Sequence, residues 1–290
     1  MSSQIEFKIH PKENIYFAIK VVMALIIYCS LIGILTIEGK PETIALKTVF
    51  IFYGILILSY VFFRLGIFIG YLKGNAIKVS PLQFPDIFDI ANKQSERLGL
   101  SHVPDVYIMQ SGGILNAFAT RFFGTNYIVL YSEVVEAAFE KDKLMLEFII
   151  GHELGHVKRK HLLKRILLFP AVIVPFLGPA YSRACEYTCD NIGYALCPKG
   201  AKNGLLLLVS GRGLFSKVNV REYTNQSFSE DGFWHWFAEK VSSHPHITKR
   251  LLKFPELPQT EPQWKSRELI VEEPKIVATP SHDYSKYMPK

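Results

Sequence analysis

Residues 149–163 read IIGHELGHVKRKHLL, and the middle of this stretch holds two histidines four positions apart, His152 and His156. The apolar residues before them favour a buried helix, on which the two imidazoles project from one face and can reach a single metal ion. Glu153 lies beside that face, where a carboxylate can take a proton from an attacking water and deliver it to a leaving amine. The pattern predicts half of a zinc site; the competing interpretation is an amphipathic helix that buries two hydrogen-bonded histidines.

A catalytic zinc site needs a third protein ligand and an open position for water. Candidates follow in the run SRACEYTCD at 182–190. Cys185 and Cys189 could offer thiolates, or they could be small buried apolar residues. Glu186 could bind zinc, and Asp190, one helical turn further on, could hydrogen-bond a ligand histidine. The spacing of these two carboxylates also fits a solvated acidic edge, so several third ligands remain open at this point.

These motifs together resemble the membrane metallopeptidases of the HtpX and CAAX prenyl protease (Ste-type) group. The motifs occur in the family's order: NAFAT at 116–120, GHELGH at 151–156, S-R-x-x-E-Y-x-x-D at 182–190 and SHPHITKRL at 243–251. The resemblance implies a cofactor, one Zn²⁺ per chain, held by His152, His156 and Glu186. It also implies that Glu153 is the general base and acid.

The same resemblance implies roles for residues outside the zinc ligands. Asp190 would support a ligand histidine, His244 and Arg250 would act beside the zinc or the substrate as catalytic residues, and Asn116 would bind substrate. An asparagine in a loop can instead shape a turn, and a His-Pro pair can simply start a helix. The sequence departs from the family at Cys189, where alanine is usual, which brings an oxidisable group near the site.

The first 72 residues are the most apolar part of the chain. The run 21–37 contains no charge and, extended back to residue 16, is long enough to cross a hydrocarbon core of ~30 Å. A second run at 43–72 is interrupted only by Lys47 and Arg64, which lie near enough to its ends to reach the membrane surface. A cleaved signal peptide is the alternative, but no small-residue cleavage site follows the first run. Lysines before the first span and after the second predict that both ends face the cytoplasm.

The chain then divides into four predicted regions. They are a cytoplasmic N-terminal segment at 1–15, a transmembrane hairpin at 16–72 with spans at 16–37 and 44–72, a zinc metallopeptidase domain at 79–254, and a proline-rich C-terminal tail at 255–290. Within the domain, periodicity predicts helices at 85–98, 134–139, 143–164 and 182–196 and strands at 103–109 and 126–131. His161 and His246 are expected at the surface or at helix ends. The predicted fold class is α+β: a mainly helical, zincin-like metalloprotease domain with a small β-hairpin or sheet, preceded by two transmembrane helices.

A short apolar segment, ILLFPAVIVPFLGPA at 166–180, suggests a third span, but three prolines interrupt its 15 residues. If it crossed the membrane once, Glu186 would lie opposite the two histidines. Crossing twice needs about 40 residues at helical rise, and only 29 separate His156 from Glu186. A shared zinc site therefore predicts that the segment dips into the membrane surface or packs as a kinked lid.

The predicted function is a membrane-anchored zinc-dependent endopeptidase, multi-pass in the cell membrane, with its catalytic domain on the cytoplasmic side. Its expected partners are the lipid bilayer and polypeptide substrates that are membrane-associated or misfolded. Nucleic acid is not expected despite the net charge of +7, because no stripe of Lys and Arg alternates with aromatic residues. One alternative is a zinc-holding, non-proteolytic membrane scaffold or regulator. The other is a prenyl-protein processing protease, but two spans are too few to form the walls of the large enclosed chamber of that branch of the family. The sequence leaves the oligomeric state open.

Overall fold

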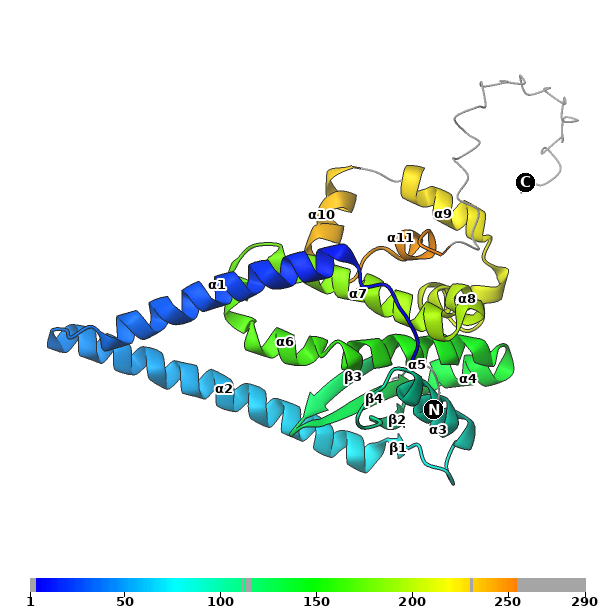
Figure 1. The fold of residues 1–290 in the computed structure, drawn as a ribbon, viewed down its shortest axis with the longest axis horizontal. Helices are drawn as coiled ribbons and strands as arrows, with labels where there is room; N and C mark the ends of the chain where they lie inside the picture. The colour runs from blue at the N-terminus through cyan, green and yellow to red at the C-terminus, as the bar shows by residue number, and fades with distance from the viewer. Residues whose placement is uncertain (1–3, 111, 113–115, 230–231, 255–290) are drawn as a thin grey trace, which may run out of the picture. The chain divides into compact units, whose positions relative to one another are not determined.

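The computed structural model describes residues 4–110, 112, 116–229 and 232–254 (Figure 1), so the tail predicted at 255–290 lies outside it. The elements follow one another along the chain as α1 (Pro11–Thr36), α2 (Pro41–Asn75), β1 (Ile77–Lys78), α3 (Pro85–Arg97), β2 (Asp105–Met109), β3 (Ala117–Phe122), β4 (Thr125–Tyr131), α4 (Ser132–Glu140), α5 (Lys143–Lys158), α6 (His161–Leu167), η1 (Phe169–Ile173), α7 (Leu177–Leu196), α8 (Pro198–Ser210), η2 (Phe215–Lys217), α9 (Val220–Ser229), α10 (Phe233–Val241) and α11 (Ile247–Leu251). Two apolar helices precede a mainly helical domain with one small mixed sheet, which confirms the predicted fold class.

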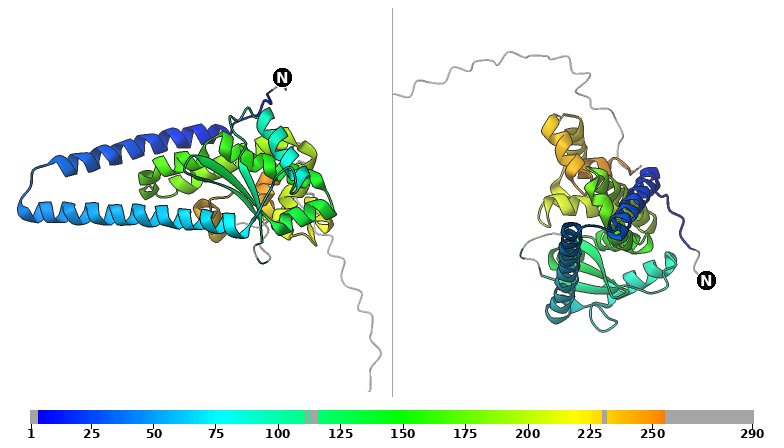
Figure 2. Two further views of the ribbon diagram at one scale, coloured as in Figure 1. Left: turned by 90° about the horizontal axis from the view of Figure 1, so that it is seen from below. Right: turned by 90° about the vertical axis from the view of Figure 1, so that its left-hand side faces the viewer.

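Helices α1 and α2 form a hairpin whose turn lies far from the sheet and from the other helices (Figure 2). Both are long and apolar enough to cross a membrane, with mean hydropathy of 2.4 and 2.1. At 26 and 35 residues they are about 39 and 52 Å long, which exceeds a hydrocarbon core of ~30 Å. Their large apolar side chains point away from the protein; Leu58 is 71% exposed, for example. Near the turn, the ammonium group of Lys47 bonds to the carbonyl oxygens of Leu35 and Ile37, where a cation complements the end of α1.

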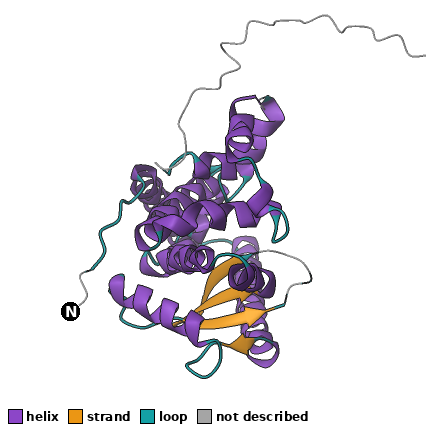
Figure 3. Cartoon of the chain, turned by 90° about the vertical axis from the view of Figure 1, so that its right-hand side faces the viewer, coloured by secondary structure: helices purple, strands orange, loops and turns teal. Residues whose placement is uncertain are grey.

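The sheet has the strand order β1-β2-β4-β3, with β2 and β4 parallel and the other pairs antiparallel. Its side chains alternate between two apolar surfaces. Ile128 and Leu130 of β4 point into the main core with α5, whereas Tyr127 and Val129 pack on the last turns of α2 through Ile69. The second apolar helix is therefore packed directly against the sheet. Figure 3 shows the strands lying together on one side of the helical part.

Strand β3 forms one edge of the sheet and was not among the predicted strands. Its sequence AFATRF pairs only with β4 among the described residues, from Ala117 opposite Leu130 to Phe122 opposite Thr125. Most of its residues are partly buried, and no other described strand pairs with its outer side.

Helices α5 and α7 pack closely against each other through small residues. A methyl group added at Gly155 would lie 3.2 Å from the Sγ and Cα atoms of Cys189, and one added at Gly193 would lie 2.9 Å from the carbonyl oxygen of Phe148. Because the separation of packed helices depends on the side chains between them, these small residues let the two backbones approach closely. This contact sets the distance between the histidines of α5 and the carboxylates of α7.

The helix predicted over 143–164 is two helices, so the prediction of a continuous helix was wrong. Helix α5 ends at Lys158 and α6 begins at His161, because Lys160 adopts a left-handed conformation with φ of 54°. A lysine in this conformation costs roughly 1–2 kcal/mol. The change of direction buries His161 to 5% exposure and brings its ring against α5, where the buried contacts offset that cost.

The apolar segment 166–180 completes α6, forms the single turn η1, and enters α7 through Phe176, whose φ is 61°. It does not form one straight span. This matches the expectation of a short kinked segment, and it brings Glu186 back to the side of the domain on which α5 lies. Helix α7 begins at Leu177, five residues before the predicted start.

Replacing Gly193 by alanine tests the close packing of α5 and α7. The added methyl would meet the carbonyl oxygen of Phe148 at 2.9 Å, so we expect a loss of about 1–3 kcal/mol in the free energy of unfolding. Gly178→Ala, also on α7, is the control, since nothing lies within 4 Å of its added methyl. Thermal unfolding in detergent compares the two. Equal midpoints would show that the close approach does not matter.

Candidate metal centre

Helix α5 presents the two histidines and the glutamate of the central motif on one side. Asp142 caps the start of this helix by accepting a hydrogen bond from the backbone N–H of Leu144, at 3.0 Å. Three turns later His152 and Glu153 are buried and His156 is partly buried, all three lining one cavity. The ring centroids of His152 and His156 are 5.1 Å apart. The helical spacing has thus brought both imidazoles to the same wall.

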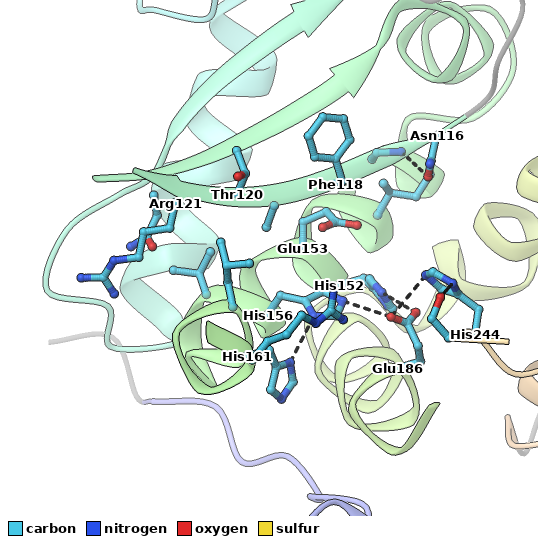
Figure 4. A pocket seen from close by; sticks show the side chains of 18 of the residues that line it. Asn116, Phe118, Thr120, Arg121, His152, Glu153, His156, His161, Glu186 and His244 are labelled. Atoms are coloured by element: carbon cyan, nitrogen blue, oxygen red, sulfur yellow. Dashed lines mark hydrogen bonds and ion pairs between the residues drawn. The ribbon is translucent and has the colours of Figure 1, made fainter. Parts of the chain in front are cut away.

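Helix α7 supplies a carboxylate that faces both rings. The Nε2 atom of His152 lies 3.4 Å from one oxygen of Glu186, and the Nε2 atom of His156 lies 3.5 Å from the other. Glu186 is 4% exposed and lines the same cavity (Figure 4). Of the third ligands left open by the sequence, Glu186 therefore lies where both histidines converge.

The spacing of these three side chains suits a zinc ion. Bonds of about 2.0–2.2 Å in a tetrahedral arrangement separate neighbouring ligand atoms by about 3.4 Å. The two observed distances between histidine nitrogens and carboxylate oxygens, 3.4 and 3.5 Å, agree with this value. Both are also long for a good hydrogen bond. The donor set and its spacing fit a small divalent cation that binds nitrogen and oxygen.

Cys189 offers a different third ligand. One ligand atom from each of His152, His156 and Cys189 lies within 4.8 Å of the other two. The thiol, however, is fully buried, does not line the cavity, and lies 3.7 Å from the Nδ1 atom of His161. Burial raises its pKa well above the usual value, which disfavours the thiolate that a metal needs. Glu186 is the better ligand, because a catalytic metal must face the cavity.

Behind the histidines lies a buried chain of charges. The Nδ1 atom of His152 is 3.0 Å from Asp190, which in turn accepts two hydrogen bonds from Arg250, at 2.8 and 2.6 Å. Burial acts to lower the pKa of His152, but its contacts with the carboxylates of Asp190 and Glu186 outweigh burial and raise the pKa to about 10. The same contacts with His152 and His156 hold the pKa of Glu186 well below its usual range despite burial. The site therefore favours positive charge between these side chains.

Two of the predicted catalytic residues occupy different positions around this chain. Arg250 is 4% exposed and holds Asp190, so its contacts indicate a positioning residue. His244 is exposed at the rim of the cavity, with its Nε2 atom 3.5 Å from Glu186. The catalytic role given to each of them stays a prediction.

A second buried chain, which the sequence did not reveal, approaches His156 from behind. The Nδ1 atoms of His156 and His161 are 3.1 Å apart, and the Nε2 atom of His161 lies 3.2 Å from Glu13 of α1. Arg159 donates to the same Glu13 oxygen at 3.0 and 2.9 Å. His161 was expected at the surface or at a helix end; it begins α6 but is buried. Its signal in the sequence was its position five residues after His156.

The cavity lies between the metal-site residues and the edge strand β3 and has a volume of about 260 Å³ (Figure 4). Residues Ala117 to Arg121 of β3 form the wall opposite α5. Asn116 lies at the start of this wall, where its side-chain oxygen accepts a hydrogen bond from the N–H of Ala117 at 2.9 Å. This contact holds the side chain of Asn116 at the start of β3, and the predicted role of Asn116 in substrate binding stays a prediction.

Comparison with known proteins agrees with this geometry. Residues 81–177 match the profile of peptidase family M48. The match includes His152, Glu153 and His156, whereas Glu186 lies beyond its end. The resemblance inferred from the sequence motifs is thereby confirmed.

Two curated relatives match parts of this chain. The plastoglobule-localized metallopeptidase 48 of Arabidopsis thaliana is 27% identical over 191 residues, covering 59% of this chain and 52% of that protein. The CAAX prenyl protease 1 homolog of Dictyostelium discoideum is 43% identical over 65 residues, covering 22% of this chain and 15% of that protein. The chain thus spans about half the length of the first relative and less of the second. The crystal structure of S. mikatae Ste24p matches with a TM-score of 0.46 and 17% identity, over 86% of this chain and 67% of that chain.

Replacing Arg250 by alanine tests the buried chain behind His152. The change leaves the carboxylate of Asp190 buried without its guanidinium partner, so we expect a loss of about 3–5 kcal/mol in stability. Lys249→Ala is the matched control, because Lys249 pairs with Glu239 from a side chain that is 41% exposed and such pairs contribute about 0–1 kcal/mol. Thermal unfolding measures both variants. An Arg250→Ala variant that unfolds at the same temperature as the wild type would argue against a structural role for the pair.

Proposed function

We propose that the protein is a membrane-anchored zinc endopeptidase that hydrolyses membrane-associated or misfolded polypeptides. One observation carries this proposal: two histidines and a glutamate from different helices converge at 3.4 and 3.5 Å on the wall of a cavity that Glu153 also lines. The match of residues 81–177 to peptidase family M48 supports a metallopeptidase, and the two long apolar helices support the anchor.

His152, His156 and Glu186 would hold the zinc ion, and Asp190 would fix the ring of His152 through its Nδ1 atom. Zinc bound there would act as a Lewis acid that polarises the peptide carbonyl and makes water more acidic. Glu153 would take the proton from the attacking water as its oxygen bonds to the carbonyl carbon. The same carboxyl would then give the proton to the leaving nitrogen as the peptide bond breaks.

The cavity walls would position the substrate for this step. The unpaired edge of β3 would add an extended peptide as a further strand, whose backbone would then lie across the cavity from Glu153. Asn116, at the start of that edge, would contact the substrate backbone. His244, at the opposite rim, would donate a hydrogen bond to the carbonyl oxygen as negative charge develops.

Prenyl-protein processing is the second candidate. It is favoured by the local similarity, 43% over 65 residues, to a protein named as a CAAX prenyl protease homolog. The two candidates share one chemistry and differ in the end of the substrate that enters the cavity. A prenylated C-terminal peptide offered beside an unmodified internal peptide distinguishes them: preferential cleavage of the prenylated peptide would replace the first assignment with the second.

Glu153→Gln tests the assigned chemistry. We expect the variant to bind zinc as tightly as the wild type and to lose peptide hydrolysis by about 10²–10⁴-fold, because the amide cannot take a proton from water. The measurement is cleavage of unfolded casein in detergent, with zinc content determined on the same samples. Glu147→Gln, on the same helix but outside the cavity lining, is the control and should retain activity.

Three outcomes of that assay are informative. Loss of activity with zinc retained, together with inhibition of the wild type by a chelator, supports the proposal. If both proteins hold zinc and neither cleaves, the non-proteolytic scaffold becomes the better account. An active Glu153→Gln variant would contradict the assignment of the base.

We further propose that the domain after the two apolar helices lies on the cytoplasmic side of the cell membrane, because lysines flank these helices at the domain end. A thiol reagent that cannot cross membranes should label Gly39→Cys, in the turn of the hairpin, in intact cells. It should label Leu82→Cys, at 96% exposure beyond the end of α2, only after lysis. The reverse pattern would place the domain outside.

A further inference from the structure

A large apolar surface next to the cavity remains exposed in the domain. It includes the end of α6 and η1, where Phe169 is 65% exposed and Ile173 is 75% exposed. The other exposed apolar side chains of this segment are Ile166, Leu167, Val172 and Phe176. Isolated apolar side chains at a surface are ordinary, but six within eleven residues form a patch that needs a partner.

Contacts with α1 fix the level of this segment relative to the membrane helices. The hydroxyl of Tyr28 donates a hydrogen bond to the carbonyl oxygen of Leu167 at 3.0 Å. Tyr28 lies twelve residues inside a span that begins at residue 16, which is about 18 Å along the helix. Its side chain leans back toward the start of α1, so Leu167 lies roughly 10–15 Å inside a hydrocarbon core of ~30 Å.

The charges at the start of α6 lie where headgroups are expected. The ammonium group of Lys164 lies 4.7 Å from the ring centroid of Phe17, near the beginning of the same span. Arg165 follows it in the sequence, and Lys160 lies four positions before it. The segment therefore changes from basic at the level of the membrane surface to apolar at the level of the acyl chains, which is the order that an anionic leaflet favours.

Helix α10 extends the apolar surface with aromatic side chains. Trp234 and Trp236 are 76% and 51% exposed, and Phe237 joins them to Phe176 of the η1 segment through rings 6.2 Å apart. Tryptophan is enriched where a membrane meets water. The turn between β3 and β4 contributes Phe123, 79% exposed, whose ring lies 5.6 Å from that of Phe62 on α2.

We propose that this surface, formed by 166–176, α10 and Phe123, is covered by lipid, with η1 inserted among the acyl chains and the tryptophans at the interface. The proposal rests on the membrane anchoring proposed above and deepens it. Because Leu162, Leu163 and Arg165 of α6 also line the cavity, the catalytic cleft opens at the level of the headgroups. The substrate class that follows is polypeptide segments that leave or lie on the bilayer surface.

Tryptophan quenching by brominated lipids tests the proposal on the full chain in vesicles. The three native tryptophans are Trp234, Trp236 and Trp264, so a background with all three changed to phenylalanine lets one reporter be introduced at a time. Ile173→Trp reports on η1. Leu58→Trp, in the middle of α2, reports on the anchor, and Leu82→Trp, in the exposed turn after β1, is the control that should remain in water.

The expected result is that lipids brominated near the middle of the acyl chains quench Ile173→Trp as strongly as Leu58→Trp and leave Leu82→Trp unchanged. Lipids brominated near the headgroup should quench a lone Trp234 more strongly than those brominated deeper. Thermal unfolding of each variant shows that its fold is intact.

The other outcomes separate the two proposals. If lipid quenches Leu58→Trp but not Ile173→Trp, the proposed lipid-covered surface is overturned and the anchor remains. A protein segment or a second copy of the chain would then cover the patch. Absence of quenching at both positions would overturn the anchor and the surface together. Equal quenching of all three reporters would also contradict the proposal, because lipid contact would not be confined to this face.

Discussion

The candidate site depends on the short distance between helices α5 and α7. Neither helix carries the complete donor set: α5 holds the two histidines and α7 holds Glu186 and Asp190. The histidine nitrogens meet the carboxylate of Glu186 at 3.4 and 3.5 Å only because Gly155 and Gly193 leave no side chain between the backbones. A methyl group at either position would press on the opposite helix, and the spacing that suits a small cation would change.

The close packing of α5 and α7 buries polar side chains, and other parts of the domain provide their hydrogen-bond and ion-pair partners. Packing two carboxylates and two imidazoles into the interior is costly unless each finds a partner. Arg250 of α11 donates hydrogen bonds to Asp190, and His161 lies between His156 and Glu13. Residues far apart in the sequence therefore meet at one centre. Glu13 belongs to the first apolar helix, so this helix begins in contact with His161, which in turn contacts His156. The sheet adds its edge strand β3, whose residues Ala117 to Arg121 line the cavity.

Much of this arrangement could be predicted from the sequence, because its signals are local. Helical spacing alone placed His152 beside His156 and Glu186 one turn before Asp190, and long apolar runs gave the two N-terminal helices. Other features depend on contacts distant in the chain. Strand β3 has no clean alternation and exists through its pairing with β4. The break at Lys160 follows no glycine or proline, and it is held by His161 meeting Glu13, 148 residues away in the sequence. No local sequence pattern predicts such a contact.

The central claim is that His152, His156 and Glu186 hold a zinc ion on the wall of the cavity. X-ray absorption by the zinc-loaded protein tests it directly, because nitrogen and oxygen ligands lie at about 2.0–2.2 Å from zinc and a thiolate at about 2.3 Å. The account predicts a shell of nitrogen and oxygen alone, which loses one light scatterer in Glu186→Ala and is unchanged in Cys189→Ala. A sulfur scatterer that disappears in Cys189→Ala would contradict it and move the metal away from the cavity, toward the buried thiol.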